Sequence, residues 1–353
     1  MKDMQPTFII ISPGFAKDEL DSTCLPLQQN LIKSINKNFP SVKIIIVALQ
    51  YPLTQSEYFW NGNKVITFGG RTKGKLHTLL LWRKLWQCLK KLKKENNVQG
   101  LLSFWAAECA LVGSRFGKKC NIKHRCWILG QDAKKENKHI RRMKPAPEEL
   151  ISLSDFITEE FYKNHGIRPA HIVSPGIEPS QFVNNMQEKN IDVIGVGSLI
   201  PLKQYQIFIR IIAALKEKYP LINAVISGKG PEENKLKGLI SFYKLEKNIS
   251  LIGEISHEEV LMIMQRAKVF LHPSNYEGFG VVCIEALYAG AQVVSFSKPM
   301  KEEIKHWHIV TNEIEMLGQT LQLLQQQDIK RNPVLFNSMD DCAAKMVKLF
   351  GDF

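Results

Sequence analysis

Short runs of apolar, mostly β-branched residues alternate along the chain with stretches in which apolar residues recur every three or four positions. The runs predict buried strands, which in the first half fall at 7–12, 43–49, 64–68, 100–104 and 125–129. The periodic stretches between most of them predict helices at 23–37, 76–95 and 105–116. Strands that alternate with helices predict an α/β fold, with parallel sheets whose two faces are covered by helices.

The second half of the chain repeats this arrangement. Its predicted strands fall at 191–196, 222–227, 249–252, 268–272 and 291–296. The two series meet near the segment SPGIEPSQF (174–182), and a chain of 353 residues is long enough for two domains of ordinary size. We therefore expect two Rossmann-like domains that face each other across a cleft, an N-terminal one at 1–178 and a C-terminal one at 179–335.

Glycines follow several of the predicted strands. Gly14 follows the first strand, Gly197 follows the first strand of the second half, and Gly228 and Gly230 follow the next one. Ligands of open α/β sheets bind beyond the carboxyl ends of the strands, where glycine leaves room for them. Tight turns also need glycine, and this alternative stays open. The placement of all four glycines around one predicted cleft favours a function.

The segment NYEGFGVVCIEALYAG (275–290) places two carboxylates near a helix start. Gly278 and Gly280 leave the backbone uncovered where a helix should begin, and the unpaired N–H groups of a helix start attract phosphate. In one interpretation the glycines admit a diphosphate, while Glu277 and Glu285 hold sugar and ribose hydroxyls on either side of it. In the other, Glu277 is a helix cap and Glu285 is a solvated helix residue. Periodicity alone favours neither.

This segment resembles the signature of the retaining family 4 glycosyltransferases of the GT-B fold, in which two glutamates separated by seven residues bracket a glycine-rich turn. The likeness covers most of the second half. The segments that carry it are VGSLIPLKQYQIFIRIIAAL (196–215), AVISGKGPEENKL (224–236) and ISLIGEISHEEVLMIMQRAKVFLHPSNYEGFG (249–280). Together they are far more specific than a lone Gly-x-Gly.

The resemblance implies roles for the residues of this half. Glu285 would hold the ribose of a nucleotide, Glu277 the transferred sugar, and Lys203 the donor diphosphate. The backbone groups expected to contact the same diphosphate are those of Gly278, Phe279 and Gly280. The implied co-substrate is a UDP- or GDP-sugar, with no other cofactor and no metal. A final helix (336–353) is expected to pack back on the first domain.

The sequence also departs from the family pattern. The family usually has a second diphosphate-binding cation, an arginine, at the position of Ser198, and Lys229 is a candidate replacement. A further difference is the segment SKPMKEE (297–303), which stands where the family usually has Gly-Gly before an acid. The remaining residues of the expected donor site are Gly197, Ser198, Gly228, Lys229 and Gly230. Because the usual arginine is missing at Ser198, the alternative to an enzyme is a noncatalytic binding or partner protein with a weakened donor site.

The likeness is weaker in the first half. Gly14 in SPGF (12–15) best matches a family glycine loop that approaches the diphosphate. Asp132 in WILGQDA (127–133) fits a strand end where the family has a His-Gly-x-Asp-like stretch, but Leu129 stands where histidine is common. Asp132 is expected either to act in catalysis by holding an acceptor or donor hydroxyl or to be a helix cap or loop residue, and the sequence favours neither.

Charge is unevenly divided along the chain. Residues 1–175 carry 28 Lys and Arg against 14 Asp and Glu, whereas residues 176–353 carry 19 against 20. Such an excess indicates an anionic partner or surface. A basic helical stretch at 76–97 also contains a periodic apolar stripe, formed by Leu79, Trp82, Leu85, Trp86, Leu89 and Leu92. We expect the leucines to pack in the core, and the lysine end with 134–144 to face an anionic membrane surface.

Composition limits the remaining function classes. A hydrophobic content of 44% with 23% charged residues is typical of globular domains. Seven cysteines without a C-x-x-C pair indicate reduced thiols in the cytoplasm, and no apolar run is long enough to cross a membrane. No nucleic-acid-binding motif is present. We expect a cytoplasmic enzyme, peripheral on the inner face of the membrane, that transfers sugar to a saccharide or lipid-linked acceptor in cell-surface glycan synthesis.

Overall fold

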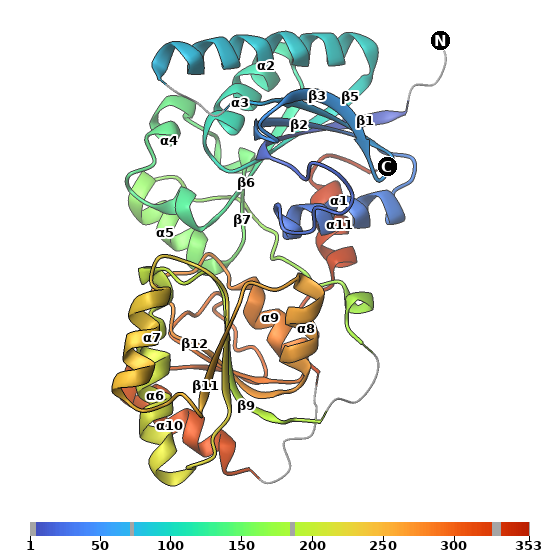
Figure 1. The fold of residues 1–353 in the computed structure, drawn as a ribbon. Helices are drawn as coiled ribbons and strands as arrows, with labels where there is room; N and C mark the ends of the chain where they lie inside the picture. The colour runs from blue at the N-terminus through green and yellow to red at the C-terminus, as the bar shows by residue number, and fades with distance from the viewer. Residues whose placement is uncertain (1–4, 71–73, 184–187, 327–332, 353) are drawn as a thin grey trace. The chain divides into compact units, whose positions relative to one another are not determined.

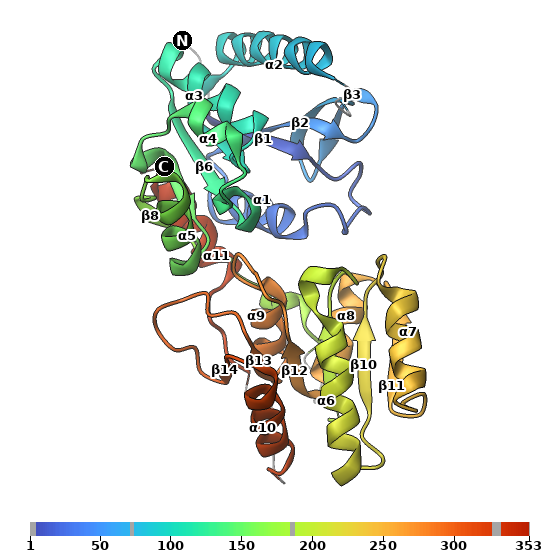
Figure 2. The same cartoon turned by 90° about the vertical axis from the view of Figure 1, so that its left-hand side faces the viewer.

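The computed structural model describes residues 5–70, 74–183, 188–326 and 333–352. It divides into two units, one formed by Met1–Gly176 with Met339–Phe353 and the other by Ile177–Ser338. Each unit is built on a largely parallel sheet with helices on both faces, which confirms the predicted α/β class (Figures 1 and 2). In the described part of the chain, no helix combines the length and the apolar character needed to cross a membrane.

The first unit contains an eight-stranded sheet. Its strands are β1 (Pro6–Gly14), β2 (Lys43–Tyr51), β3 (Gln55–Trp60), β4 (Asn63–Phe68), β5 (Asn97–Phe104), β6 (Lys123–Ile128), β7 (Leu150–Ser152) and β8 (His171–Ile172). They lie in the order β3-β4-β2-β1-β5-β6-β7-β8, and all neighbours are parallel except β3 and β4. The long apolar runs of β1 and β2 therefore lie near the middle of the sheet, where both of their faces are covered.

The helices of this unit pack on both faces of the sheet. They are α1 (Pro26–Asn38), α2 (Lys75–Glu95), α3 (Glu108–Cys120), α4 (Lys138–Met143), α5 (Asp155–His165) and α11 (Met339–Lys348). Side chains of β1 alternate between the two faces: Ile9 and Ile11 join the core beneath α2 and α3, whereas Phe8 packs against the ring of Phe350 on the other face, 4.8 Å between ring centroids. Alternate side chains of β1 thus pack against helices on opposite faces of the sheet.

Helix α11 returns to the first unit and is held there by charge and by packing. The Asp340 carboxylate accepts hydrogen bonds from Ser34 at 2.6 Å, and from Lys37 and Asn38 at 2.7 Å, all on α1. Gly100 of β5 makes room for the Phe350 ring, because a Cβ at this position would lie 2.3 Å from it. Burial of such a ring contributes about 2 kcal/mol.

Three strands of this sheet were not predicted from the sequence: the two- and three-residue strands β8 and β7, and the longer strand β3. β3 pairs antiparallel with β4 across a two-residue turn in which Asn61 and Gly62 both have positive φ angles, 45° and 76°. Asn-Gly is the preferred dipeptide for such a hairpin turn, so the signal was present in the sequence. β3 itself was missed because it lies at the edge of the sheet and largely exposes alternate residues instead of forming a continuous apolar run.

Helix α2 corrects part of the expected apolar stripe. Leu85, Leu89 and Leu92 are buried under it as predicted, and Leu81 joins them. Leu79 was expected in the core, but 57% of it is exposed, as is 57% of Leu80. The stripe therefore begins two residues later than predicted, because Leu81 and not Leu79 lies on the helix face that meets the sheet.

The second unit contains a six-stranded parallel sheet in the order β11-β10-β9-β12-β13-β14. Its strands are β9 (Ile191–Val196), β10 (Ala224–Ser227), β11 (Ile249–Gly253), β12 (Ala267–His272), β13 (Gln292–Ser295) and β14 (Trp307–Ile309). Its helices are α6 (Tyr205–Lys218), α7 (Glu233–Phe242), α8 (His257–Gln265), α9 (Val281–Tyr288) and α10 (Glu313–Leu324). Helices α6, α7 and α10 cover one face, and α8 and α9 lie on the other (Figure 1).

Two glycines lock the loops after β9 and β10 together. A Cβ on Gly228 would lie 1.9 Å from the carbonyl oxygen of Gly197, and one on Gly230 would lie 2.3 Å from the carbonyl oxygen of Leu199. The loops are also joined by backbone hydrogen bonds, including that from the Leu199 N–H to the Lys229 carbonyl at 3.0 Å. These glycines therefore have a packing role whatever the unit binds.

We predict that Gly228→Ala lowers the free energy of unfolding by about 2 kcal/mol or more, because the added methyl group collides with backbone that has no rotamer to escape into. Gly238→Ala is the matched control, since that helical glycine has open space around its Cβ position and alanine there gains about 0.5–1 kcal/mol. Urea unfolding followed by circular dichroism measures both. Equal stability of the two variants would contradict the packing role.

Candidate functional site

The neighbouring strands β9 and β12 define the point where the sheet of the second unit changes direction. The chain runs from β9 through β10 to β11 on one side and then resumes at β12 on the other. The carboxyl ends of two such strands form the edge at which open α/β sheets bind ligands. Two of the residues singled out in the sequence follow these two ends, namely Lys203 after β9 and Glu277 after β12.

Lys203 is delivered by a short 3-10 turn, Pro201–Lys203, between β9 and α6. Gln204 follows in the left-handed conformation, with a φ angle of 49°, and redirects the chain into α6. Only 17% of the Lys203 side chain is exposed, and its ammonium group forms an ion pair with Oε1 of Glu277. Two residues that are 74 positions apart in the sequence thus meet at one edge of the sheet.

Glu277 receives two further donors from its own loop. His272, the last residue of β12, contacts Oε1 through Nε2 at 3.1 Å, and the Ser274 hydroxyl donates to the same oxygen at 2.9 Å. Burial lowers the pKa of His272, so its ring acts as a neutral donor. Burial alone would raise the pKa of Glu277, but the contacts from His272 and Lys203 outweigh it and lower the pKa below the ordinary value of 4.5. Glu277 is therefore a fixed carboxylate at neutral pH.

Helix α9 begins directly after this carboxylate. Gly280 takes a left-handed conformation, with a φ angle of 84°, and no side chain caps the helix start. Phe279 is buried against Trp307 and Phe336, which anchors the turn. The glycine-rich stretch therefore combines a buried aromatic anchor with a conformation that L side chains rarely adopt. It presents the α9 N-terminus, which carries partial positive charge, at the same edge as Lys203.

Glu285 lies one turn inside α9 and faces a partner that the sequence analysis did not identify. Its Oε1 is 2.8 Å from Nε2 of His257, the first residue of α8. The charges of Glu277, Lys203 and Glu285 all act on the buried thiol of Cys283, which lies two residues before Glu285. The structure therefore brings the lysine and both acids into one neighbourhood. Only the Ser256–Glu259 capping box, which marks the start of α8, could have directed attention to His257.

The remaining donor-side residues lie in the two interlocked loops. Gly228 and Gly230 have the packing role described above, and Gly197 supplies the carbonyl group that Gly228 packs against. Ser198 and Lys229 are both exposed. Because Lys229 is exposed, its side chain can turn toward an anion. Its assignment as a replacement for the missing arginine stays a prediction.

The residues predicted in the first half lie in the first unit. Gly14 ends β1 opposite Tyr51, and a Cβ there would lie 3.1 Å from the Cβ of Tyr51. Asp132 belongs to the 3-10 turn Gly130–Ala133 after β6, where its carboxylate accepts the Leu129 N–H at 2.8 Å. The structure thus shows the cap role for Asp132. Burial raises the pKa of this carboxyl to about 7, against the effect of its backbone hydrogen bonds.

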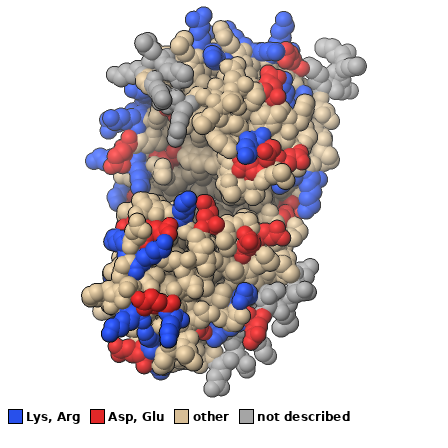
Figure 3. All heavy atoms as spheres, in the orientation of Figure 1, with Lys and Arg blue, Asp and Glu red and all other residues tan. Residues whose placement is uncertain are grey.

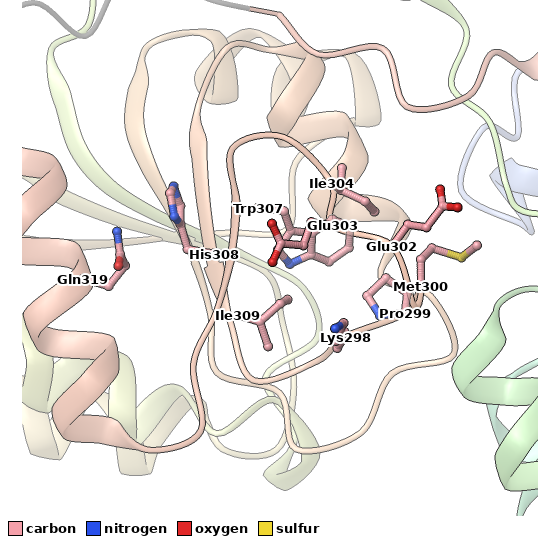
Figure 4. A pocket seen from close by; sticks show the side chains of 10 residues that line it. All are labelled: Lys298, Pro299, Met300, Glu302, Glu303, Ile304, Trp307, His308, Ile309 and Gln319. Atoms are coloured by element: carbon pink, nitrogen blue, oxygen red, sulfur yellow. The ribbon is translucent and has the colours of Figure 1, made fainter.

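The segment at 297–303 that departs from the family pattern lines a separate hollow of about 280 Å³ (Figure 4). Lys298 and Glu303 line it together with Trp307 of β14 and Gln319 of α10. Lys203, Glu277 and Glu285 are not among its lining residues. The unusual loop therefore lines a cavity that includes neither Glu277 nor Glu285. The Trp307 indole is anchored there by donation to the Ser295 hydroxyl at 2.8 Å.

Residues 176–333 match the family model described as "Glycosyl transferases group 1". Over this part, somewhat less than half of the chain, the protein is similar to the group 1 glycosyltransferases. The match covers Lys203, Glu277 and Glu285 and nearly all of the second unit, which we call the group 1 domain.

Comparison with individual proteins agrees with this assignment. The gpi3 subunit of phosphatidylinositol N-acetylglucosaminyltransferase from Schizosaccharomyces pombe is 26% identical over 133 residues, 38% of this chain and 29% of that protein. An uncharacterized glycosyltransferase from Haemophilus influenzae is 28% identical over 169 residues, 46% of each chain. This chain thus spans less than half the length of either relative.

A solved structure extends the likeness to both units. The HepE protein of Anabaena, solved in complex with UDP and glucose, superimposes with a TM-score of 0.66 over 98% of this chain and 95% of its own, at 16% identity. At that identity the likeness shows the fold alone. The fold is GT-B, as the resemblance implied, with the group 1 domain as its second unit.

We predict that Glu277→Gln removes part of the acid sensitivity of the group 1 domain. Because the pKa of Glu277 is lowered by folding, its carboxylate stabilises the folded state above pH 4.5, and this contribution is lost as the pH falls below 4.5. Urea unfolding from pH 7 to pH 3 should show a decline shallower by about 1–3 kcal/mol in the variant. The exposed Glu258→Gln is the control and should follow the wild type; identical profiles for all three proteins would refute the assignment.

Proposed function

We propose that this chain is a retaining glycosyltransferase that moves a sugar from a nucleoside diphosphate donor to a saccharide or lipid-linked acceptor. The observation that carries the proposal is the meeting of Lys203, Glu277 and the uncapped N-terminus of α9 at the carboxyl edge of one sheet. This edge offers a cation and helix N–H groups to a diphosphate, and a fixed carboxylate to sugar hydroxyls. The family of the group 1 domain supports the same reading.

The chemistry requires these groups. When the bond from the sugar's anomeric carbon to the diphosphate oxygen breaks, negative charge grows on the phosphate and positive charge grows on the sugar ring. Lys203 and the α9 N-terminus would stabilise the leaving diphosphate, and the Glu277 carboxylate would orient the sugar through its hydroxyls. The acceptor hydroxyl then bonds to the anomeric carbon, and its proton passes to the departing diphosphate. Asp132 stays a candidate for contact with the acceptor from the first unit.

Glu277 and Lys203 form an ion pair in this structure, so we expect donor binding to involve an exchange of partners. The diphosphate would compete with Glu277 for the ammonium group, while His272 and Ser274 retain the carboxylate oxygen. This retention keeps Glu277 in place as Lys203 turns to the phosphate. The alternative function is a noncatalytic donor-binding protein. It stays open because Ser198, which is exposed, supplies no second cation beside Lys203.

For the donor, we propose a UDP-sugar before a GDP-sugar, because the similarly folded HepE was solved with UDP and glucose. For the acceptor, we propose a lipid-linked one, because the matched relative from Schizosaccharomyces pombe is named for transfer to phosphatidylinositol. Both choices rest on likeness to those proteins. A role in cell-surface glycan synthesis and a location at the cytoplasmic face of a membrane follow as parts of the same proposal.

We expect the purified protein to gain thermal stability with UDP-glucose, UDP-N-acetylglucosamine or GDP-mannose, since a ligand at a hundred times its dissociation constant adds about 2.7 kcal/mol. Lys203→Ala should then slow sugar transfer about 100- to 1,000-fold, because it removes a cation that acts on the leaving group. The control is Lys237→Ala on α7, whose ammonium group is exposed and pairs with Glu233. Donor binding without any transfer or hydrolysis would instead support the noncatalytic alternative.

The first unit supports the membrane part of the proposal. The basic residues along α2 are exposed, namely Arg83, Lys84, Lys90, Lys91, Lys93 and Lys94. Figure 3 shows Lys and Arg side chains over the region where Figure 1 places this helix. Exposed Leu79 and Leu80 lie one turn from Arg83 and Lys84, which is the combination that binds anionic lipid surfaces.

We expect the protein to float with phosphatidylcholine vesicles that contain phosphatidylserine and to remain behind with phosphatidylcholine alone. Replacing Leu79 and Leu80 together by serine should reduce recovery, whereas Leu221→Ser should not, although Leu221 on the group 1 domain is 93% exposed. Added salt should lower recovery by screening the lysines. Equal recovery with both vesicle types would reject an electrostatic attachment.

A further inference from the structure

The second acid of the group 1 domain is held by a single side chain. His257 Nε2 lies 2.8 Å from Glu285 Oε1, and within the described ranges no other side chain forms a hydrogen bond or an ion pair with this carboxylate. Glu277, by comparison, takes three donors on one oxygen. Only 15% of the Glu285 side chain and 26% of the His257 side chain are exposed, so the contact is largely protected from water.

The position of His257 is fixed by the start of its helix. The Ser256 hydroxyl accepts the Glu259 N–H at 3.3 Å, while the Glu259 carboxylate accepts the Ser256 N–H at 2.8 Å. This capping box sets the first turn of α8, on which His257 lies, and α8 packs beside α9, which carries Glu285 (Figure 1). The imidazole therefore reaches the carboxylate from a rigid neighbouring helix.

Glu285 is the charge that acts on this imidazole. On α8 itself, Glu258 and Glu259 are exposed, and Glu259 is engaged with Ser256. Of the groups on β12, which also packs against α8, Lys268 pairs with Asp192 and His272 contacts Glu277. On α9, burial raises the pKa of Cys283 and keeps its thiol neutral. The hydrogen bond and charge of Glu285 raise the pKa of His257, although burial acts to lower it.

We propose that His257 is a positioning residue for the donor: it holds one oxygen of Glu285 so that the other receives the ribose hydroxyls, and its protonation couples donor affinity to pH. The proposal rests on the function proposed above and adds the residue that orients the ribose-binding acid. A carboxylate that is already held on one oxygen loses less rotational freedom when it binds a diol. The entropy lost on donor binding is therefore smaller than for a carboxylate that rotates freely.

The direction of the pH effect follows from the charge of the pair. While His257 is protonated, the pair with Glu285 is neutral overall; once the imidazole loses its proton, the pair carries a net negative charge close to a dianionic donor. Affinity should therefore fall as the pH rises through the pKa of His257. A nucleotide sugar is the right probe, because its diphosphate is esterified at both ends and keeps a constant charge between pH 6 and pH 8.

The alternative is a clamp that merely ties α8 to α9. Both roles predict some loss of stability on substitution, so unfolding temperature does not separate them. Only the positioning role predicts that the affinity for the donor, and its dependence on pH, change in protein that remains folded.

The test is calorimetric titration of the full chain with UDP-glucose, UDP-N-acetylglucosamine and GDP-mannose at pH 6, 7 and 8, below the unfolding temperature of every variant. Wild type should bind its donor several-fold more tightly at pH 6 than at pH 8. His257→Gln keeps a hydrogen-bond donor but cannot titrate, so its affinity should be near the wild-type value at pH 8 and independent of pH. His257→Leu should bind about tenfold more weakly than wild type does at pH 8, and its affinity should not change with pH.

The control is His308→Gln, which replaces another half-buried histidine of the same unit, hydrogen-bonded to the Gln292 amide at 2.9 Å. It should keep the wild-type affinity and pH profile. Wild-type affinity in His257→Leu, or a wild-type pH profile in His257→Gln, would overturn the positioning role while leaving the proposed function intact. Failure of wild type to bind any nucleotide sugar would overturn the proposed function itself, and the positioning role with it.

Discussion

The ion pair between Lys203 and Glu277 is the interaction on which the rest of the site depends. Neither charge is stable in a largely buried place without a partner, and each is carried by a loop that emerges from the carboxyl end of a different strand. The parallel order of β9 and β12 brings those ends together, and the interlocked glycine loops on one side and the Phe279 anchor on the other hold the two loops in register. The strand order of the sheet thus places Lys203 beside Glu277 at the edge where we expect the donor to bind.

The two acids of the signature are supported in different ways, and this difference suits different tasks. Glu277 is fixed from three directions, which suits a group that must stay in place while charge develops nearby. Glu285 is held on one oxygen by an imidazole, which orients its other oxygen toward a pair of hydroxyls.

The sequence predicted most of the architecture because buried parallel strands are continuous apolar runs, and those runs are hard to mistake. β3 escaped because an edge strand alternates, and only its Asn61-Gly62 turn marked it. Leu79 was misplaced because period alone does not say where a helix first meets its sheet. In the site, the family likeness named Lys203 and both glutamates, but not His257, whose role depends on which helices become neighbours. The steric reason for Gly228 was likewise invisible, since it involves backbone 31 residues away.

The return of α11 to the first unit affects how the chain is made. During synthesis the whole of the group 1 domain, Ile177–Ser338, leaves the ribosome before Met339–Lys348 does. Until then, the surface of α1 that receives Asp340 and the Phe350 site over Gly100 stay uncovered. The domain begun first is therefore the last to be finished, and Phe8, which packs against Phe350 in the finished unit, stays uncovered for the time needed to translate the second unit.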